Sequence, residues 1–145
     1  MGKRSVSIAW KVYLVYGMYI VVFGILLLVA PRMFAEGEFE SFTSAIWTEF
    51  AQANAEAASF IELVYRSAGC MVLLVGIFTV FVALYPYRKA EAWSWWAALI
   101  VGVTTWGYML LYTLIIGEIG PLVLGAILFL IAIVLPAKTM LSKSS

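Results

Sequence analysis

The fold of this chain is decided by residues 92–136, which read AWSWWAALIVGVTTWGYMLLYTLIIGEIGPLVLGAILFLIAIVLP. Glu118 is the single charged residue in this stretch. An uncharged apolar helix of about 20 residues is long enough to cross the hydrocarbon core of a bilayer. Glycine and proline at residues 117–121 interrupt the stretch once. We therefore predict a helical hairpin with membrane spans at about residues 92–116 and 119–136.

Two more apolar runs come earlier in the chain and predict spans at about residues 9–30 and 60–85. Of the 145 residues, 65% are hydrophobic and only 12% are charged, so lipid is the expected solvent. Backbone amides in lipid must be bonded within their own segment, which favours helices. We predict an all-α polytopic membrane protein, with residues 1–145 forming a single four-helix transmembrane domain. The first span lacks a small-x-small cleavage site, so we expect it to be retained.

The distribution of positive charge predicts the orientation of this bundle. Four spans would place seven of the nine basic residues on one side of the membrane: Lys3, Arg4, Lys11, Arg88, Lys89, Lys138 and Lys143. Basic residues accumulate on the cytoplasmic side of membrane proteins. We therefore predict a cell-membrane protein with both termini in the cytoplasm and residues 31–59 outside.

The outer segment contains a helical pattern of its own. Phe39, Phe42, Ile46 and Phe50 follow one another at steps of three or four residues, which places them on one helical face. Glutamates and amides occupy much of the rest of the segment. We predict an amphipathic helix over about residues 39–56 that covers the outer end of the bundle or meets a partner.

Pairs of glycines predict where the first two spans touch. Gly17 and Gly24 are seven residues apart, as are Gly69 and Gly76. Seven residues are about two helical turns, so each pair shares a face. Small residues let helices approach closely in lipid. We expect the first two spans to pack against each other through these glycines.

The composition excludes several classes of chemistry. The chain contains neither histidine nor aspartate, and Cys70 is its single cysteine. Histidine-based metal and haem sites, Ser-His-Asp catalysis, disulfides and iron–sulfur clusters are therefore excluded within this chain. We predict no cofactor and no metal, and we expect Cys70 to be a small buried residue rather than a reactive thiol. Without a basic cluster, no nucleic-acid partner is expected.

Ionisable and aromatic residues at the outer end of the bundle form the candidate site. Glu62 and Arg66 have the spacing of an ion pair on one helix face. Tyr65 lies between them, and Tyr112 and Glu118 belong to the outer end of the hairpin. These residues form either a structural ion pair that orients the second span or a ligand-binding cluster, and the boundary position of Arg66 favours the structural role.

A family resemblance covers about residues 60–115. Residues 65–69 read YRSAG, Gly76 follows, and residues 86–96 read PYRKAEAWSWW. This pattern resembles small prokaryotic four-helix membrane proteins described as DoxX-like. Some members of the wider DoxX group are subunits of membrane-bound quinone-linked oxidoreductases, so the resemblance implies an accessory role.

The leading hypothesis from the sequence is a non-catalytic accessory or scaffold subunit of a membrane complex. Its expected partners are the lipid bilayer and another membrane protein, or further copies of itself. The alternative is a binder or enzyme for a quinone or a lipid, with an outer cavity lined by Tyr65, Arg66, Tyr112 and Glu118. A third hypothesis is a small channel that forms on oligomerisation.

Overall fold

The computed structural model describes residues 2–117 and 120–142, and all regular structure in these residues is helical. Three stretches are long and apolar enough to cross a membrane. They are α1 (Gly2–Val29), α4 (Ala55–Val82) with the π-helical turn η1 (Ala83–Tyr87), and α5 (Ala92–Ile116). Helix α6 (Gly120–Val134) is equally apolar but has 15 residues. The all-α class is thus as predicted, and three of the four predicted spans correspond to helices that are long and apolar enough to cross a membrane.

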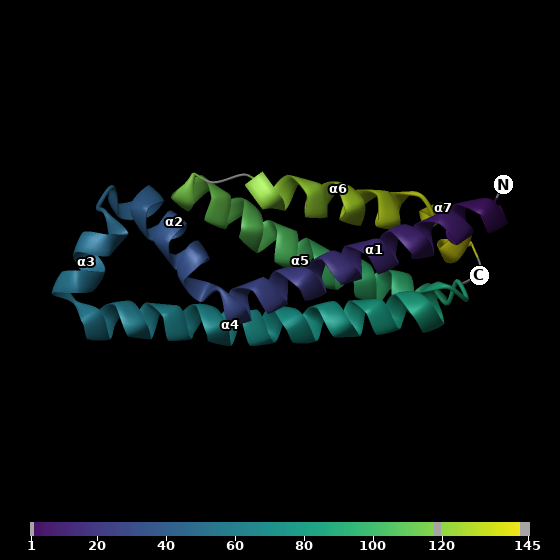
Figure 1. The fold of residues 1–145 in the computed structure, drawn as a ribbon. Helices are drawn as coiled ribbons and strands as arrows, with labels where there is room; N and C mark the ends of the chain where they lie inside the picture. The colour runs from purple at the N-terminus through teal and green to yellow at the C-terminus, as the bar shows by residue number, and fades with distance from the viewer. Residues whose placement is uncertain (1, 118–119, 143–145) are drawn as a thin grey trace.

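These helices run along one another in an elongated bundle (Figure 1). Both termini lie at one end, together with the short helix α7 (Ala137–Leu141). Helices α2 (Pro31–Thr43) and α3 (Trp47–Ala53) lie at the opposite end. We call the end with the termini the inner end and the end with α2 and α3 the outer end.

Helices α1 and α4 pack closely through the glycines that the sequence singled out. A Cβ atom on Gly24 would lie 2.6 Å from the backbone nitrogen of Leu73, and one on Gly76 would lie 2.7 Å from that of Val21. These distances are shorter than any real carbon contact, so the two backbones meet where side chains are missing. The predicted interface between the first two spans is confirmed.

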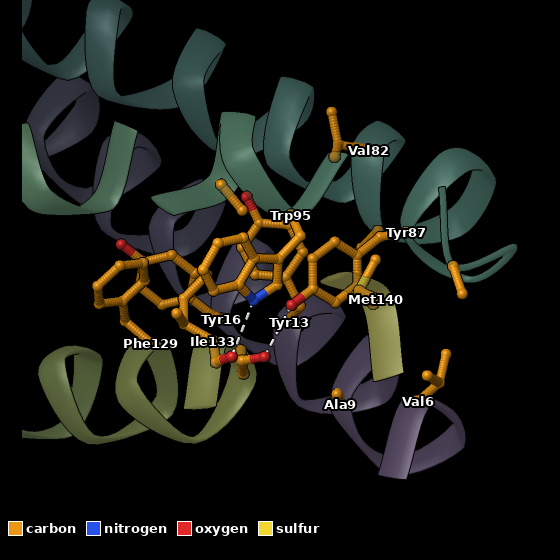
Figure 2. Close-up of a cluster of buried hydrophobic side chains, with 14 residues drawn as sticks. Val6, Ala9, Tyr13, Tyr16, Val82, Tyr87, Trp95, Phe129, Ile133 and Met140 are labelled. Atoms are coloured by element: carbon orange, nitrogen blue, oxygen red, sulfur yellow. Dashed lines mark hydrogen bonds between the residues drawn. The ribbon is translucent and has the colours of Figure 1, made fainter. Parts of the chain in front are cut away.

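The main core lies at the inner end, where aromatic side chains pack against the C-terminal end of α6 (Figure 2). The Tyr87 hydroxyl donates to the carbonyl of Ala132 at 2.7 Å, and the Trp95 indole N–H donates to the carbonyl of Ile133 at 2.9 Å. Carbonyls in the last turn of a helix lack backbone donors, and Pro136 has no N–H to supply one. The two aromatic donors satisfy these carbonyls and fix α6 to the rest of the bundle.

The prediction of a single amphipathic helix over residues 39–56 is wrong, because the helix is interrupted between α2 and α3. Ser44 adopts a left-handed conformation with φ of 59° and ends α2. Local polar bonds favour the break: the Thr43 hydroxyl accepts the N–H of Ala45 at 3.2 Å, and the Glu40 carboxylate accepts that of Trp47 at 2.8 Å.

The break also divides the predicted apolar stripe. Phe39 and Phe50 pack with the buried Trp47 in a small second core. Phe42 and Ile46 remain exposed, at 63% and 54% of their surface.

Cys70 is exposed on α4, so its predicted burial is wrong as well. Successive helical residues point about 100° apart. Because the neighbouring Gly69 faces α1, Cys70 turns away from it, toward the surface of the bundle.

Candidate functional site

A cavity of about 250 Å³ lies among α1, α4 and α5. It exists because α5 packs against α6, α2 and η1 but makes little contact with α4 along its length. The wall supplied by α1 is largely aromatic, with Tyr13, Tyr16, Tyr19 and Phe23. Among the residues that the structure describes, no carboxylate, lysine or arginine lines the cavity. Its chemistry is therefore that of an apolar, ring-rich pocket with a few hydroxyl groups.

The cavity continues into a second hollow of about 270 Å³ toward the inner end. The two hollows share five lining residues: Tyr13, Val75, Thr79, Ala98 and Val101. Val75 and Val101, on α4 and α5, are exposed at 41% and 43% of their surface. The hollows thus form one groove that opens sideways between the two helices, which we call the α4–α5 groove.

The α4–α5 groove is long enough to hold more than a single ring. Its α1 wall runs from Tyr13 to Phe23, and ten helical residues span ~15 Å at 1.5 Å per residue. The Thr79 hydroxyl in the wall donates to the carbonyl of Val75 at 2.8 Å, so its proton is already used. A bound molecule would meet mainly rings, methyl groups and thioethers.

Trp106 on α5 is the most distinctive residue of this wall. Its indole ring fills the space that a side chain on Gly125 of α6 would need, since a Cβ there would lie 2.8 Å from the ring. The indole Nε1 has almost no accessible surface and lies close to the Tyr16 hydroxyl. The indole N–H therefore faces protein atoms rather than the open part of the groove.

Helix α2 closes the outer end of the gap between α4 and α5. Its Glu38 carboxylate accepts a hydrogen bond from the Tyr65 hydroxyl of α4 and lies close to the Tyr112 hydroxyl of α5. Its Ser41 hydroxyl donates to the carbonyl of Ile116 at 2.7 Å. These polar contacts tie α2 to both helices at the point where they are furthest apart.

The structure brings together two of the five predicted site residues, Tyr65 and Tyr112, around Glu38. Arg66 instead donates from Nη1 to the carbonyl of Leu28 at 3.2 Å. It forms no ion pair with Glu62 within the described residues, where the recorded pair is Arg32 with Glu36.

Glu62 is half-buried on α4, and Glu118 lies outside the described residues. Neither Glu62, Tyr65, Arg66 nor Tyr112 lines the α4–α5 groove. The path of the groove depends on the angle between two helices, which no local pattern in the sequence gives. Sequence reasoning also missed Glu38, although Glu38 lies one helical turn after Phe34, a ring that packs against Phe23 of α1.

No group of three or more acidic or cysteine side chains able to hold a metal ion occurs in residues 2–117 and 120–142. Comparison with known proteins adds no assignment: no family model matches the chain, and no curated protein or solved structure is detectably similar to it. The geometry of the α4–α5 groove is therefore the basis for any functional argument.

Proposed function

We propose that this protein is a four-span integral membrane protein that binds a neutral lipophilic molecule in the α4–α5 groove. The observation that carries the proposal is the cavity of about 250 Å³, walled by aromatic rings and lined by no charged side chain of residues 2–117 and 120–142. Ligand sites are typically concave, apolar and furnished with a few polar groups. An apolar cavity that stays dry takes up small apolar molecules.

The membrane topology that the proposal requires is supported by the charges at the two ends of the bundle. Arg88 lies over the ring of Trp10 at 5.1 Å at the inner end, where basic and aromatic residues meet. Helix α6 would be the fourth span; its 15 residues reach ~22 Å, so the bilayer would thin slightly around it. With both termini in the cytoplasm, α2 and α3 would form the outer cover, and the groove would face the hydrocarbon.

The test fills the groove with a larger side chain. It then identifies the small molecules that stay bound when the protein is extracted from its native membrane. Val101→Phe places a ring in the groove, whereas Val103→Phe places the same ring on the lipid-facing side of α5, where Val103 is 59% exposed. Native mass spectra of gently extracted protein should show a discrete small-molecule adduct for the wild type and for Val103→Phe. Val101→Phe should lose at least ~90% of the adduct, because the ring occupies its site.

An adduct that persists at full level in Val101→Phe would contradict this site. Absence of any adduct from the wild type and from the control, even after saturation with a membrane lipid extract, would contradict the function itself.

An accessory subunit is the second candidate, and one observation on α5 favours it. Gly107 is exposed, and a Cβ there would have no atom within 4 Å. Thr104 and Tyr108 flank it on the same uncovered face, and α5 is the least buried of the three long helices. A small residue on an open helix face allows another transmembrane helix to approach closely.

The DoxX-like resemblance, which stays a prediction, agrees with an accessory role. The same native mass spectra distinguish the candidates. Protein subunits present at fixed stoichiometry, and lost in Gly107→Leu, would favour the accessory role over ligand binding.

A further inference from the structure

We infer that the inner end carries a second binding site, in which Lys11 and Arg88 hold the phosphate of an anionic phospholipid beside the Trp10 ring. This site is separate from the α4–α5 groove, because none of the three residues lines the groove. It uses the proposed membrane topology but does not depend on a ligand in the groove.

The two cations come from different elements and converge on one ring. Lys11 belongs to α1, and Arg88 directly follows η1, which packs against α1. The Arg88 guanidinium carbon lies over the Trp10 ring at 5.1 Å from its centre, and the Lys11 ammonium nitrogen lies over it at 5.9 Å. Two like charges gathered at one ring repel each other, and an anion bound to both would remove this repulsion.

The backbone of Arg88 is held in place by its neighbours. Tyr87, the preceding residue, is fully buried, and its hydroxyl donates to a carbonyl of α6 at 2.7 Å (Figure 2). Ala90 adopts a left-handed conformation with φ of 58°, and the N–H of Glu91 donates to the carbonyl of Pro86 at 3.1 Å, which closes the turn. Because this turn is already ordered, binding an anion there costs less conformational entropy.

Neither cation has a carboxylate partner in the part of the chain that the structure describes. The ion pair recorded there joins Arg32 to Glu36 at the outer end. Glu91 follows Arg88 closely in the sequence, but its carboxylate accepts the indole N–H of Trp93 at 2.7 Å instead. A guanidinium that lies over a ring keeps its N–H groups at its edge, where a phosphate can accept two of them at once.

The position of the two cations along the spans favours a lipid over a soluble phosphate. Arg88 directly follows the second long apolar stretch, and Lys11 lies near the start of the first. In the proposed topology, both charges reach the headgroup level of the inner leaflet, where basic residues attract anionic lipids.

The surface next to Lys11 also suits an acyl chain. Val15, Met18 and Val22 share the helix face of Lys11, toward the outer end, and each is exposed on half or more of its surface. From Lys11 to Val22 this apolar stripe is ~16 Å long at 1.5 Å per residue. A phospholipid could therefore place its phosphate at the cations and a chain along α1, whereas a soluble phosphate would leave the stripe unused.

The experiment measures which phospholipid the full-length protein binds first. Delipidated protein in one detergent is titrated with phosphatidylglycerol or with phosphatidylcholine of identical acyl chains, and native mass spectrometry gives the affinity of the first bound lipid. We expect the wild type to bind phosphatidylglycerol at least about tenfold more tightly, because the two cations repel the choline group. In Lys11→Gln/Arg88→Gln, the two affinities should agree within about twofold, since both attracting charges are gone.

The matched control is Lys89→Gln/Lys138→Gln, which removes the same charge from the same end but leaves both cations at the Trp10 ring. Lys89 and Lys138 are both exposed. This control should keep the wild-type preference within about threefold, because the bound phosphate does not contact either residue. Lys11→Arg/Arg88→Lys, which preserves both charges, should also keep a clear preference. All of these variants should retain the small-molecule adduct of the α4–α5 groove.

A second measurement uses the wild type alone and so does not depend on a variant folding. Phosphatidylglycerol that carries a photoreactive diazirine next to its head group is activated by light in the same samples. Mass spectrometry of the digested protein then locates the labelled residues. Labels should concentrate at residues 8–18 and 84–93 and should disappear when excess unlabelled phosphatidylglycerol is added.

Each failure has its own signature. Equal affinity of the wild type for the two lipids, labels that fall elsewhere, or a preference that survives in Lys11→Gln/Arg88→Gln would overturn this site. Equal loss of preference in Lys89→Gln/Lys138→Gln would show attraction by diffuse charge and would also overturn it. If glycerol 3-phosphate displaces phosphatidylglycerol at equal concentration, the ligand is a soluble phosphate ester rather than a lipid. Absence of a groove adduct would contradict the proposed function and would leave the phosphate site standing.

Discussion

Single side chains at the outer end satisfy backbone groups that the helices leave open. Helix α1 ends at Val29, and Pro31, which starts α2, has no N–H to offer to α1. The Arg66 guanidinium donates to the carbonyl of Leu28 near this end, 38 residues away in the sequence. A cation at a helix C-terminus also interacts favourably with the helix dipole. Arg66 thus has a structural role at the junction of α1 and α2.

Replacing Arg66 tests this role directly. Arg66→Met keeps the length of the side chain but removes the donor and the charge. We expect a loss of ~1 kcal/mol in the free energy of unfolding, the lower end for a charged hydrogen bond because the side chain is exposed. Ligand binding in the α4–α5 groove should not change. Unfolding by sodium dodecyl sulfate in mixed micelles, followed by near-ultraviolet circular dichroism, gives the measurement.

Arg32→Met is the control, since Arg32 is also exposed and its guanidinium contacts the Glu36 carboxylate at 3.6 Å. Its effect should stay within ~0.5 kcal/mol. Equal losses for the two variants, or weakened ligand binding in Arg66→Met alone, would disprove the structural role.

Residue types at this end could be predicted from the sequence, but their partners could not. Tyr65 and Tyr112 were recognised as candidates because polar residues near lipid are uncommon, and they do meet. Their shared partner Glu38 lies 27 residues from Tyr65, on a helix whose path depends on the turn at Ala30. Arg66 and Glu62 have the spacing of an ion pair, but spacing alone does not choose between a carboxylate and a free carbonyl.

At the scale of elements, the glycines of α1 and α4 hold the bundle together. Gly17 faces Val80 and Gly24 faces Leu73, while Gly76 faces Val21. From Gly17 to Gly24 the chain advances seven residues along α1, and the contacted residue moves from Val80 to Leu73, seven residues in the opposite direction along α4. The two antiparallel helices therefore stay in register. In lipid the hydrophobic effect does not drive helices together, so van der Waals packing between closely approaching backbones would supply the stabilisation.

Adding one methyl group at two glycines tests this contact. Gly24→Ala would place its Cβ 2.6 Å from the Leu73 nitrogen and 2.8 Å from the Leu73 Cα, so the helices must separate. We expect a loss of ~1–3 kcal/mol in the free energy of unfolding. Gly107→Ala meets nothing within 4 Å and should be neutral or stabilising by up to ~1 kcal/mol, because alanine favours a helix more than glycine. Thermal unfolding in one detergent measures both.

Equal stabilities for the two variants would show that α1 and α4 do not depend on glycine contact. Loss of stability in Gly107→Ala alone would point to a partner already bound on α5.

Elements with strong periodicity were predictable, and elements that depend on local polar bonds were not. The span predicted at residues 92–116 agrees with α5 at both ends, because Glu91 and Gly117 bound an uninterrupted apolar run. The helix that contains the span predicted at 60–85 begins at Ala55, since residues 55–59 are mainly alanine and glutamate, which favour a helix. The break at Ser44 could not be predicted, because apolar residues keep their helical spacing on both sides of it. The side chains of Thr43 and Glu40 accept hydrogen bonds from backbone N–H groups there and interrupt the helix.

At the scale of the molecule, most basic residues lie at the inner end and most acidic residues lie at the outer end. Arg88 and Lys11 lie beside Trp10 at the inner end, whereas Glu38 and Glu40 lie on α2 at the outer end. The cavity lies between these ends, where the sequence shows only apolar runs. Such a cavity depends on the divergence of α5 from α4, and that angle results from the packing of α2, α6 and η1 together. No single stretch of sequence encodes it.

This separation predicts the orientation in the membrane, which two engineered cysteines can test. In a Cys70→Ser background, Thr48→Cys places a thiol on the exposed surface of α3, and Ser142→Cys places one just after α7. A membrane-impermeant maleimide added to intact cells should label Thr48→Cys at least ~10 times faster than Ser142→Cys, because the basic end remains in the cytoplasm. After permeabilisation, both thiols should react at similar rates, since both positions are exposed. Rapid labelling of Ser142→Cys alone in intact cells would reverse the orientation. Equal labelling of both thiols would mean that an even number of spans separates the two positions, instead of the three spans of the four-span topology. In that case α6 would lie along the membrane surface instead of crossing it, as its 15 residues would permit.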